Sequence, residues 1–172
     1  MGLIIQVNGK TPIFGKGCFI APNSTIIGAV TTGDNCSFWF NSVVRGDVNP
    51  IYIGNKVNIQ DAAVLHCLYK KSVIEIDDNV SIGHHATIHG AKIHKNVLIG
   101  IGAIVLDYVE IGENAIIAAG SVLLEKTFVE PNSIYAGVPA KKIKDISSEQ
   151  TSEMIEKIAK NYIMYAGWYK NT

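Results

Sequence analysis

The sequence predicts an all-β solenoid, a parallel β-helix built from six-residue repeats, followed by one C-terminal α-helix. Two observations predict this fold. Apolar residues recur every six positions without a gap in the second half of the chain, and a small or β-branched residue follows each of the first seven by four positions. A three-sided prism explains the period, because each short strand directs one aliphatic side chain inward and each turn begins the next side. The two series are Ile93, Ile99, Val105, Ile111, Ile117, Leu123, Val129 and Tyr135, and Val97, Ala103, Val109, Ala115, Ser121, Thr127 and Ser133.

The same spacing begins near the N-terminus. After a short lead-in over residues 1–13, the six-residue series runs through Phe14, Ile20, Ile26, Thr32, Phe38 and Val44. Cys18 and Cys36 lie eighteen residues apart, which is one full coil, so we expect both to be small core residues. The β-helix with its lead-in is therefore predicted to occupy residues 1–146.

The repeat is interrupted only in the middle of the chain. The spacing grows to nine residues before Ile53, which predicts a three-residue insertion around residues 49–51. It grows to eleven before Ile76, which predicts a five-residue loop around residues 68–72, and one residue is missing before Ile93. A pure scaffold gains nothing from such interruptions, so they indicate a functional site nearby.

The regular repeat ends near Tyr135, and a helix is predicted over residues 147–172. Ser147 is a candidate N-cap with Gln150 three positions later. Apolar and aromatic residues then follow at helical spacing, namely Ile155, Ile158, Tyr162, Tyr165 and Tyr169. We expect an amphipathic helix that packs on the prism, with its tyrosines at the contact.

Composition excludes several classes of protein. The chain has 172 residues, which predicts a single domain, and fifteen basic residues balance fifteen acidic ones. A net charge of zero disfavours nucleic acid and anionic membranes as partners. No apolar run approaches the roughly 18 residues that a membrane span needs. The N-terminal segment lacks a basic flank and a cleavage site, and the three cysteines lack metal-site spacing, so we expect a cytoplasmic protein.

Three histidines in the interrupted region form a candidate metal site. By the six-residue count, His66 and His89 follow inward residues on the same side of neighbouring coils, about 4.8 Å apart. His84 falls on a different side and cannot join them within its own chain. If prisms pack around a threefold axis, His84 of a neighbouring chain completes the set. Three neutral imidazoles with an open fourth position are typical of catalytic zinc.

Four motifs in this order resemble those of the γ-class carbonic anhydrases and their relatives: RGD at residues 45–47, NIQD at 58–61, His66, and GHxxxxHG at 83–90. The resemblance implies a left-handed parallel β-helix of hexapeptide repeats and a homotrimer. It also implies zinc, with iron or cobalt as alternatives, held by His66 and His89 of one subunit and His84 of the next.

The resemblance further assigns roles around the metal. Arg45 and Asp61 are implied to form ion pairs between subunits, with Asp47 nearby. Gln60 and Asn58 are implied to line the pocket, where Gln60 would orient a metal-bound hydroxide as it attacks carbon dioxide and yields bicarbonate. A buried pair of arginine and carboxylate between chains would set the register of the trimer.

The chain departs from the family pattern in its loops. The best-known member carries glutamates near the metal, whereas Val48 and Asn49 follow Asp47 here and no carboxylate follows His66 closely. A shorter subclass also lacks them and places a tyrosine of the C-terminal helix near the pocket, which makes Tyr162 the candidate. Two alternatives stay open: an enzyme of acyl-CoA transfer or thioester hydrolysis, and a metal-binding structural subunit without turnover.

Overall fold

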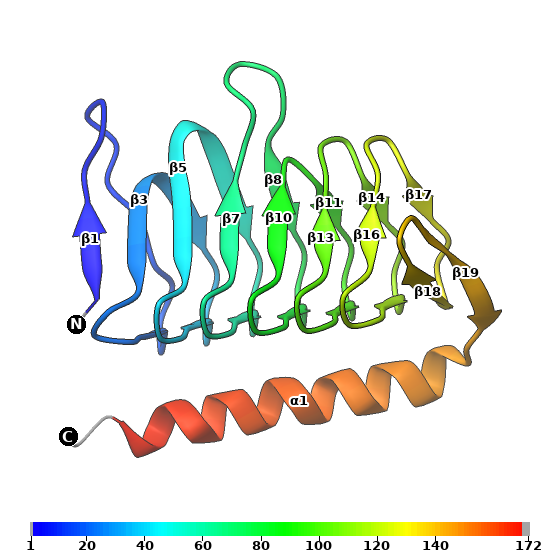
Figure 1. The fold of residues 1–172 in the computed structure, drawn as a ribbon. Coiled ribbons are helices and arrows are strands. Elements are labelled where there is room, and N and C mark those ends of the chain that lie inside the picture. Colours follow the sequence, from blue (N-terminus) through cyan, green and yellow to red (C-terminus); the bar gives the residue numbers. More distant parts are fainter. Residues whose placement is uncertain (1, 170–172) are drawn as a thin grey trace.

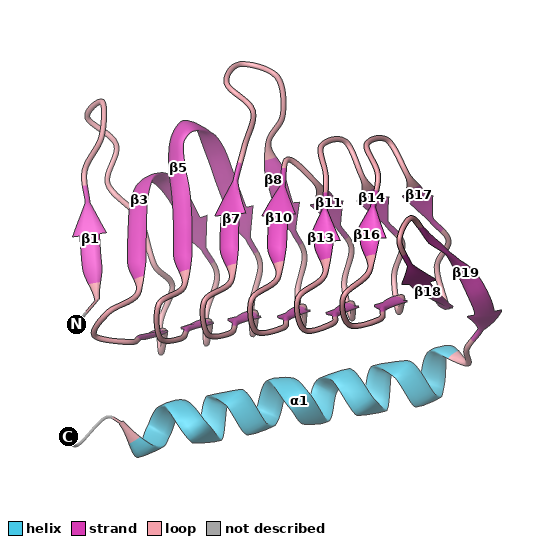
Figure 2. Ribbon diagram, in the orientation of Figure 1, coloured by secondary structure: helices cyan, strands magenta, loops and turns pink. Residues whose placement is uncertain are grey.

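The structure, a computed structural model, describes residues 2–169 as a parallel β-helix with one long helix beside it (Figure 1). Figure 2 shows that short strands alternate with turns along the whole coil. The elements are β1 (Leu3–Ile5), β2 (Phe19–Ile20), β3 (Thr25–Thr32), β4 (Ser37–Phe38), β5 (Val43–Ile53), β6 (Asn58–Ile59), β7 (Val64–His66), β8 (Ile74–Ile76), β9 (Ser81–Ile82), β10 (Thr87–His89), β11 (Lys92–Ile93), β12 (Leu98–Ile99), β13 (Ile104–Val105), β14 (Glu110–Ile111), β15 (Ile116–Ile117), β16 (Val122–Leu123), β17 (Phe128–Val129), β18 (Ser133–Gly137), β19 (Ala140–Asp145) and α1 (Ser148–Trp168).

The strands form the three sides of the prism. The first side carries β3, β5, β7, β10, β13 and β16, and the second carries β8, β11, β14 and β17. The long strand β5 belongs to both, because it turns the corner between them. The third side is a separate sheet that runs from β2 to β18 and ends with β19, which pairs antiparallel to β18.

The inward residues of successive coils stack in register and form the core. Val44, Leu65 and Ile88 are partners on adjacent strands, and each is fully buried. The column continues through Val105 and Leu123, which are also buried. Burial of each such side chain stabilises the fold by about 1.5–3 kcal/mol. The period of six therefore marks the core, as predicted.

The two predicted insertions are confirmed. Gly28 pairs with Gly46 and Val30 with Ile51, so the four residues 47–50 stand opposite Ala29 alone. The longer insertion is the loop between β7 and β8, which rises above the neighbouring turns in Figure 1. Both insertions lie at the corner between the first and second sides, so they project from the same edge of the prism.

The predictions for the N-terminal part were correct in part. Cys36 is buried, but Cys18 is only half-buried, because it lies in the first full coil near the open end of the prism. The lead-in is not separate from the coil, because Leu3 of β1 pairs in parallel with Thr25 of β3. The count of six missed this strand because a tight turn, closed by an antiparallel bridge between Val7 and Lys10, interrupts the spacing.

Helix α1 begins at the predicted cap and lies along the third side. The Ser147 hydroxyl accepts a hydrogen bond from the backbone N–H of Gln150 at 3.1 Å. The helix buries Ile155 and Ala159 against the prism and runs back from the last coil toward the first (Figure 1). It contacts β4 and β9. In residues 2–169 no helix is both long and apolar enough to cross a membrane.

Candidate metal centre

The first part of the candidate site lies on the first side of the prism. Arg45, His66 and His89 are partners on the adjacent strands β5, β7 and β10, as the six-residue count predicts. Each directly follows a buried aliphatic residue, so its side chain points outward. Together with Asp47 and Asp107, they are here called the first half-site.

The two imidazoles of the first half-site face each other. His66 Nδ1 lies 3.3 Å from His89 Nε2, and the ring centroids are 5.3 Å apart. Both side chains are largely buried, with 20% and 28% of their area exposed. Two neutral imidazoles at this spacing can bind one cation between them.

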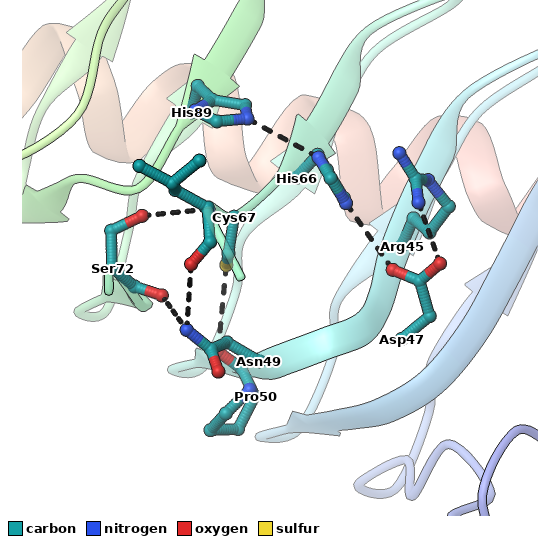
Figure 3. A network of polar contacts seen from close by, with 9 residues as sticks. Arg45, Asp47, Asn49, Pro50, His66, Cys67, Ser72 and His89 are labelled. Atoms are coloured by element: carbon teal, nitrogen blue, oxygen red, sulfur yellow. Dashed lines mark hydrogen bonds and ion pairs between the residues drawn. The ribbon is translucent and has the colours of Figure 1, made fainter. Parts of the chain in front are cut away.

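A carboxylate lies beside each of these histidines. Asp47 Oδ1 is 3.3 Å from His66 Nε2, and Asp107 Oδ2 is 2.7 Å from His89 Nδ1. Arg45 Nη1 donates to Asp47 Oδ2 at 2.6 Å (Figure 3). A carboxylate that accepts a hydrogen bond from a metal-binding histidine, as Asp107 can from His89, orients the ring and increases its basicity.

The charges of the first half-site favour an ionised carboxylate and a neutral imidazole. Burial raises the pKa of Asp47, but the hydrogen bond and the positive charge of Arg45 outweigh it, so the pKa lies below its ordinary value. Burial, and then the charge of Arg45, hold the pKa of His66 below its ordinary value, although Asp47 acts against them. A neutral imidazole is the form that binds a metal.

Two orphaned atoms show that the first half-site fits a cation. His66 Nε2 and Asp47 Oδ1 are buried and lack a hydrogen-bond partner, because their contact does not have hydrogen-bond geometry. A buried nitrogen and a buried carboxylate oxygen without partners are costly unless a positive charge joins them. Within the described part of the chain, no three His, Cys, Asp or Glu side chains are arranged to hold a metal.

His84 lies on another side, as predicted, and belongs to what is here called the second half-site, with Asp61, Gln60, Asn58 and Tyr162. It follows β9 at a corner of the third side, and its Nδ1 is 2.8 Å from Asp61 Oδ2. In residues 2–169 no hydrogen bond, ion pair or ring contact joins His84 to the histidines of the first half-site. The two half-sites are thus separate within one chain.

Gln60 and Asn58 lie on the side of the prism that carries His84. Gln60 Nε2 donates to Asn58 Oδ1 at 2.9 Å, and Asn58 Nδ2 donates to Ser81 Oγ at 2.7 Å. Both residues are buried although their side chains point outward from the prism. This hydrogen-bonded chain holds the Gln60 amide in one orientation beside the turn that leads to His84.

Tyr162 of α1 completes the second half-site. Its ring packs edge to face on Trp39 at a centroid distance of 5.2 Å. With Asp61 and other aromatic residues of α1, these rings line a pocket of about 380 Å³. Burial, and then the Asp61 carboxylate, raise the pKa of Tyr162 to about 12. Tyr162 is therefore protonated at neutral pH and can donate a hydrogen bond but cannot act as a base.

Asp107, Ser72 and Asn49 belong to the site, although sequence reasoning missed them. Asp107 contacts both His89 and Ser72. Asn49 binds the loop that carries Ser72 (Figure 3). The six-residue spacing could have located Asp107. It lies two positions after the inward Val105, which pairs with Ile88, so it stands next to Gly90 on the following coil. The neighbouring Cys67 offers no reactive group, because burial raises the pKa of its thiol to about 11.

Known proteins resemble this chain in sequence and in structure. The family described as bacterial transferase hexapeptide (six repeats) matches residues 90–125. A carbonic anhydrase of Geobacillus kaustophilus is 47% identical over 168 residues, which cover 98% of this chain and 91% of that protein. The mitochondrial gamma carbonic anhydrase 2 of Arabidopsis thaliana is 36% identical over 168 residues, or 95% of this chain and 60% of that protein. A Bacillus cereus crystal structure, provisionally described as an acetyltransferase, has a TM-score of 0.93 and 38% identity, covering 99% of this chain and 98% of that one.

Proposed function

The chain belongs to the γ-carbonic anhydrase-like family of hexapeptide-repeat proteins, and on that premise we propose that it catalyses the reversible hydration of carbon dioxide. The reaction would take place at a metal ion held between subunits of a homotrimer. One observation carries the proposal: the facing pair of His66 and His89, with an orphaned nitrogen and carboxylate beside it.

His66 and His89 of one subunit and His84 of the next would hold the metal, for which zinc is the first candidate and iron or cobalt the alternatives. When bound, such an ion acts as a Lewis acid that lowers the pKa of a coordinated water to about 7. The residues of the chain then have separate tasks. Asp107 orients the His89 ring and Asp61 orients His84. Asp47, held by Arg45, places a negative charge beside His66.

Gln60 is the residue that would orient the reacting oxygen. Its amide is held by Asn58, which in turn is held by Ser81, so it is preorganised before substrate arrives. Tyr162 and Trp39 line the pocket beside Asp61, where their rings pack edge to face. Because Tyr162 stays protonated, we assign it hydrogen-bond donation rather than proton transfer.

The outer surface of the first side supports association into a trimer. Val43, Val64, Thr87, Ile104 and Val122 are partners on successive strands and form one outward row. This row is mostly apolar, and both Val64 and Ile104 are 38% exposed in the single chain. An exposed apolar row beside a half-site favours burial against a second copy. In the trimer, Arg45 would approach Asp61 of the neighbour, as the resemblance implies.

Proton transfer to solvent has no carboxylate to carry it in the two insertions. Residues 48–50 and 67–73 contain neither Asp nor Glu. We therefore expect the hydration rate to rise with the concentration of an imidazole buffer, because a soluble base replaces the missing shuttle. A rate independent of buffer would point to a shuttle within the protein.

The decisive experiment combines metal analysis with stopped-flow hydration of carbon dioxide. Protein purified without oxygen should contain about one metal ion per chain, and His89→Ala should lose both the metal and hydration. The matched control is His94→Ala, since His94 binds Asp77 and Glu110 on another side of the prism. Bound metal without hydration would favour a structural subunit, and consumption of acetyl-CoA without metal would favour an acyltransferase.

A further inference from the structure

We infer that Asp107 and Ser72 are positioning residues that hold His89 with its proton on Nδ1 and its Nε2 lone pair directed at His66. The inference rests on the proposed function, because it explains how His89 is oriented before it binds a metal. Asp107 is buried, with 7% of the residue exposed, and its carboxylate lies between two partners. It accepts from Ser72 Oγ at 2.5 Å through Oδ1 and contacts His89 Nδ1 at 2.7 Å through Oδ2.

The chemistry of the carboxylate sets the tautomer of His89. An ionised carboxylate only accepts hydrogen bonds, so the contact at Oδ2 requires a proton on His89 Nδ1. In the neutral ring, Nε2 is then unprotonated and free to bind a cation. In metal-free protein, His66 Nδ1 can then donate to His89 Nε2, which leaves the lone pair of His66 Nε2 facing Asp47 Oδ1, and a cation bound at His89 Nε2 would replace this hydrogen bond. This explains why these two buried atoms lack partners.

The Ser72 hydroxyl is itself fixed by the two insertions of the coil. Ser72 Oγ accepts from the backbone N–H of Leu68 at 2.9 Å, so its hydroxyl proton is available for Asp107. Asn49, from the shorter insertion, donates to the carbonyl oxygens of Leu68 at 3.0 Å and of Ser72 at 2.5 Å (Figure 3). Both insertions are therefore connected through Asp107 to one metal ligand, His89.

The glycine after His89 provides an independent observation. A Cβ atom on Gly90 would lie 2.2 Å from both Asp107 Oδ1 and Ser72 Oγ. Gly90 also has a φ of +63°, a conformation that other residues rarely adopt. Only glycine leaves room for the hydrogen bond between Ser72 and Asp107, so this contact accounts for the last residue of the GHxxxxHG motif.

The proposal can be tested with Asp107→Asn and Ser72→Ala, using Asp77→Asn as the matched control. Asp77 contacts His94 Nδ1 at 3.1 Å and so forms a similar pair away from the site. The first measurement is the ¹⁵N NMR signature of the His89 ring in metal-free protein at mildly alkaline pH. Wild-type protein should show the Nδ1–H tautomer, and Asp107→Asn should shift the population toward Nε2–H.

The second measurement is zinc affinity by competition with a chromophoric chelator. Loss of such a partner typically weakens metal affinity by about 10–100-fold, which we expect for Asp107→Asn. Ser72→Ala should weaken it less and in the same direction, and Asp77→Asn should leave it unchanged. A wild-type His89 in the Nε2–H form, or a tautomer unaffected by Asp107→Asn, overturns the inference. If wild-type protein binds no zinc, the proposed function fails, and the NMR result still decides the role of Asp107.

Discussion

Two inactive variants should restore each other's metal sites when they form mixed trimers. His84→Ala removes a ligand from the second half-site and leaves His66 and His89 intact. His89→Ala removes a ligand from the first half-site and leaves His84 intact. Because the half-sites lie on different sides of the prism, each variant alone should lose every metal site. A mixed trimer should regain a site wherever the intact first half-site of one chain meets the intact second half-site of its neighbour.

The expected magnitude follows from the arrangement of the half-sites. In a cyclic trimer each site takes its first half from one chain and its second half from the next. If the two variants mix equally and at random, about one quarter of all sites are restored. In trimers that contain both variants the fraction is about one third, because each has a single junction at which an intact first half-site meets an intact second half-site. A mixture of His66→Ala and His89→Ala should restore none, because both changes fall in the same half-site.

The assay is co-refolding of differently tagged variants, followed by isolation of trimers that carry both tags. Bound zinc and stopped-flow hydration are then measured on the isolated trimers. Doubly tagged trimers of His84→Ala and His89→Ala that contain no more zinc than either parent would refute the shared site. Zinc retained by His84→Ala alone would do so more directly, since a single chain would then supply the ligands.

Three further changes test other parts of the site. Arg45→Ala should raise the dissociation constant of the trimer at least about tenfold, because the proposed ion pair with Asp61 of the neighbour would be lost, and sedimentation at low concentration measures this. Gly90→Ala should destabilise the protein by roughly 2–5 kcal/mol, since its Cβ meets Asp107 and Ser72, whereas Gly102→Ala should cost only about 1 kcal/mol. Gly102 is the control because it has a φ of +66° and nothing within 4 Å of its Cβ, and urea unfolding compares the two. In the folded protein the pKa of Tyr162 is raised from 10.0 to about 12, so the unfolded chain releases this proton more readily. The free energy of unfolding should therefore fall as pH rises from about 10 to about 12, and Tyr162→Phe should remove that part of the decrease. An identical alkaline transition in wild type and Tyr162→Phe would contradict the assigned environment.

The order of the residues by itself determined the coil and the pairing of two histidines. In a parallel coil each residue lies above the one that precedes it by one turn, so spacing converts directly into position. This is why the count placed His66 beside His89, placed His84 elsewhere, and located both insertions. The Ser147 cap was equally readable, because a helix start depends on neighbours within one turn.

Only the tertiary structure decided how the side chains at the corners interact. Ser72 and Asp107 are 35 positions apart and meet because the loop between β7 and β8 folds back over the edge of the prism. Likewise, Tyr162 lies beside Asp61 because α1 docks along the third side. Such contacts depend on the shape of an irregular loop and on the packing of a separate helix, and neither follows from the period that orders the strands.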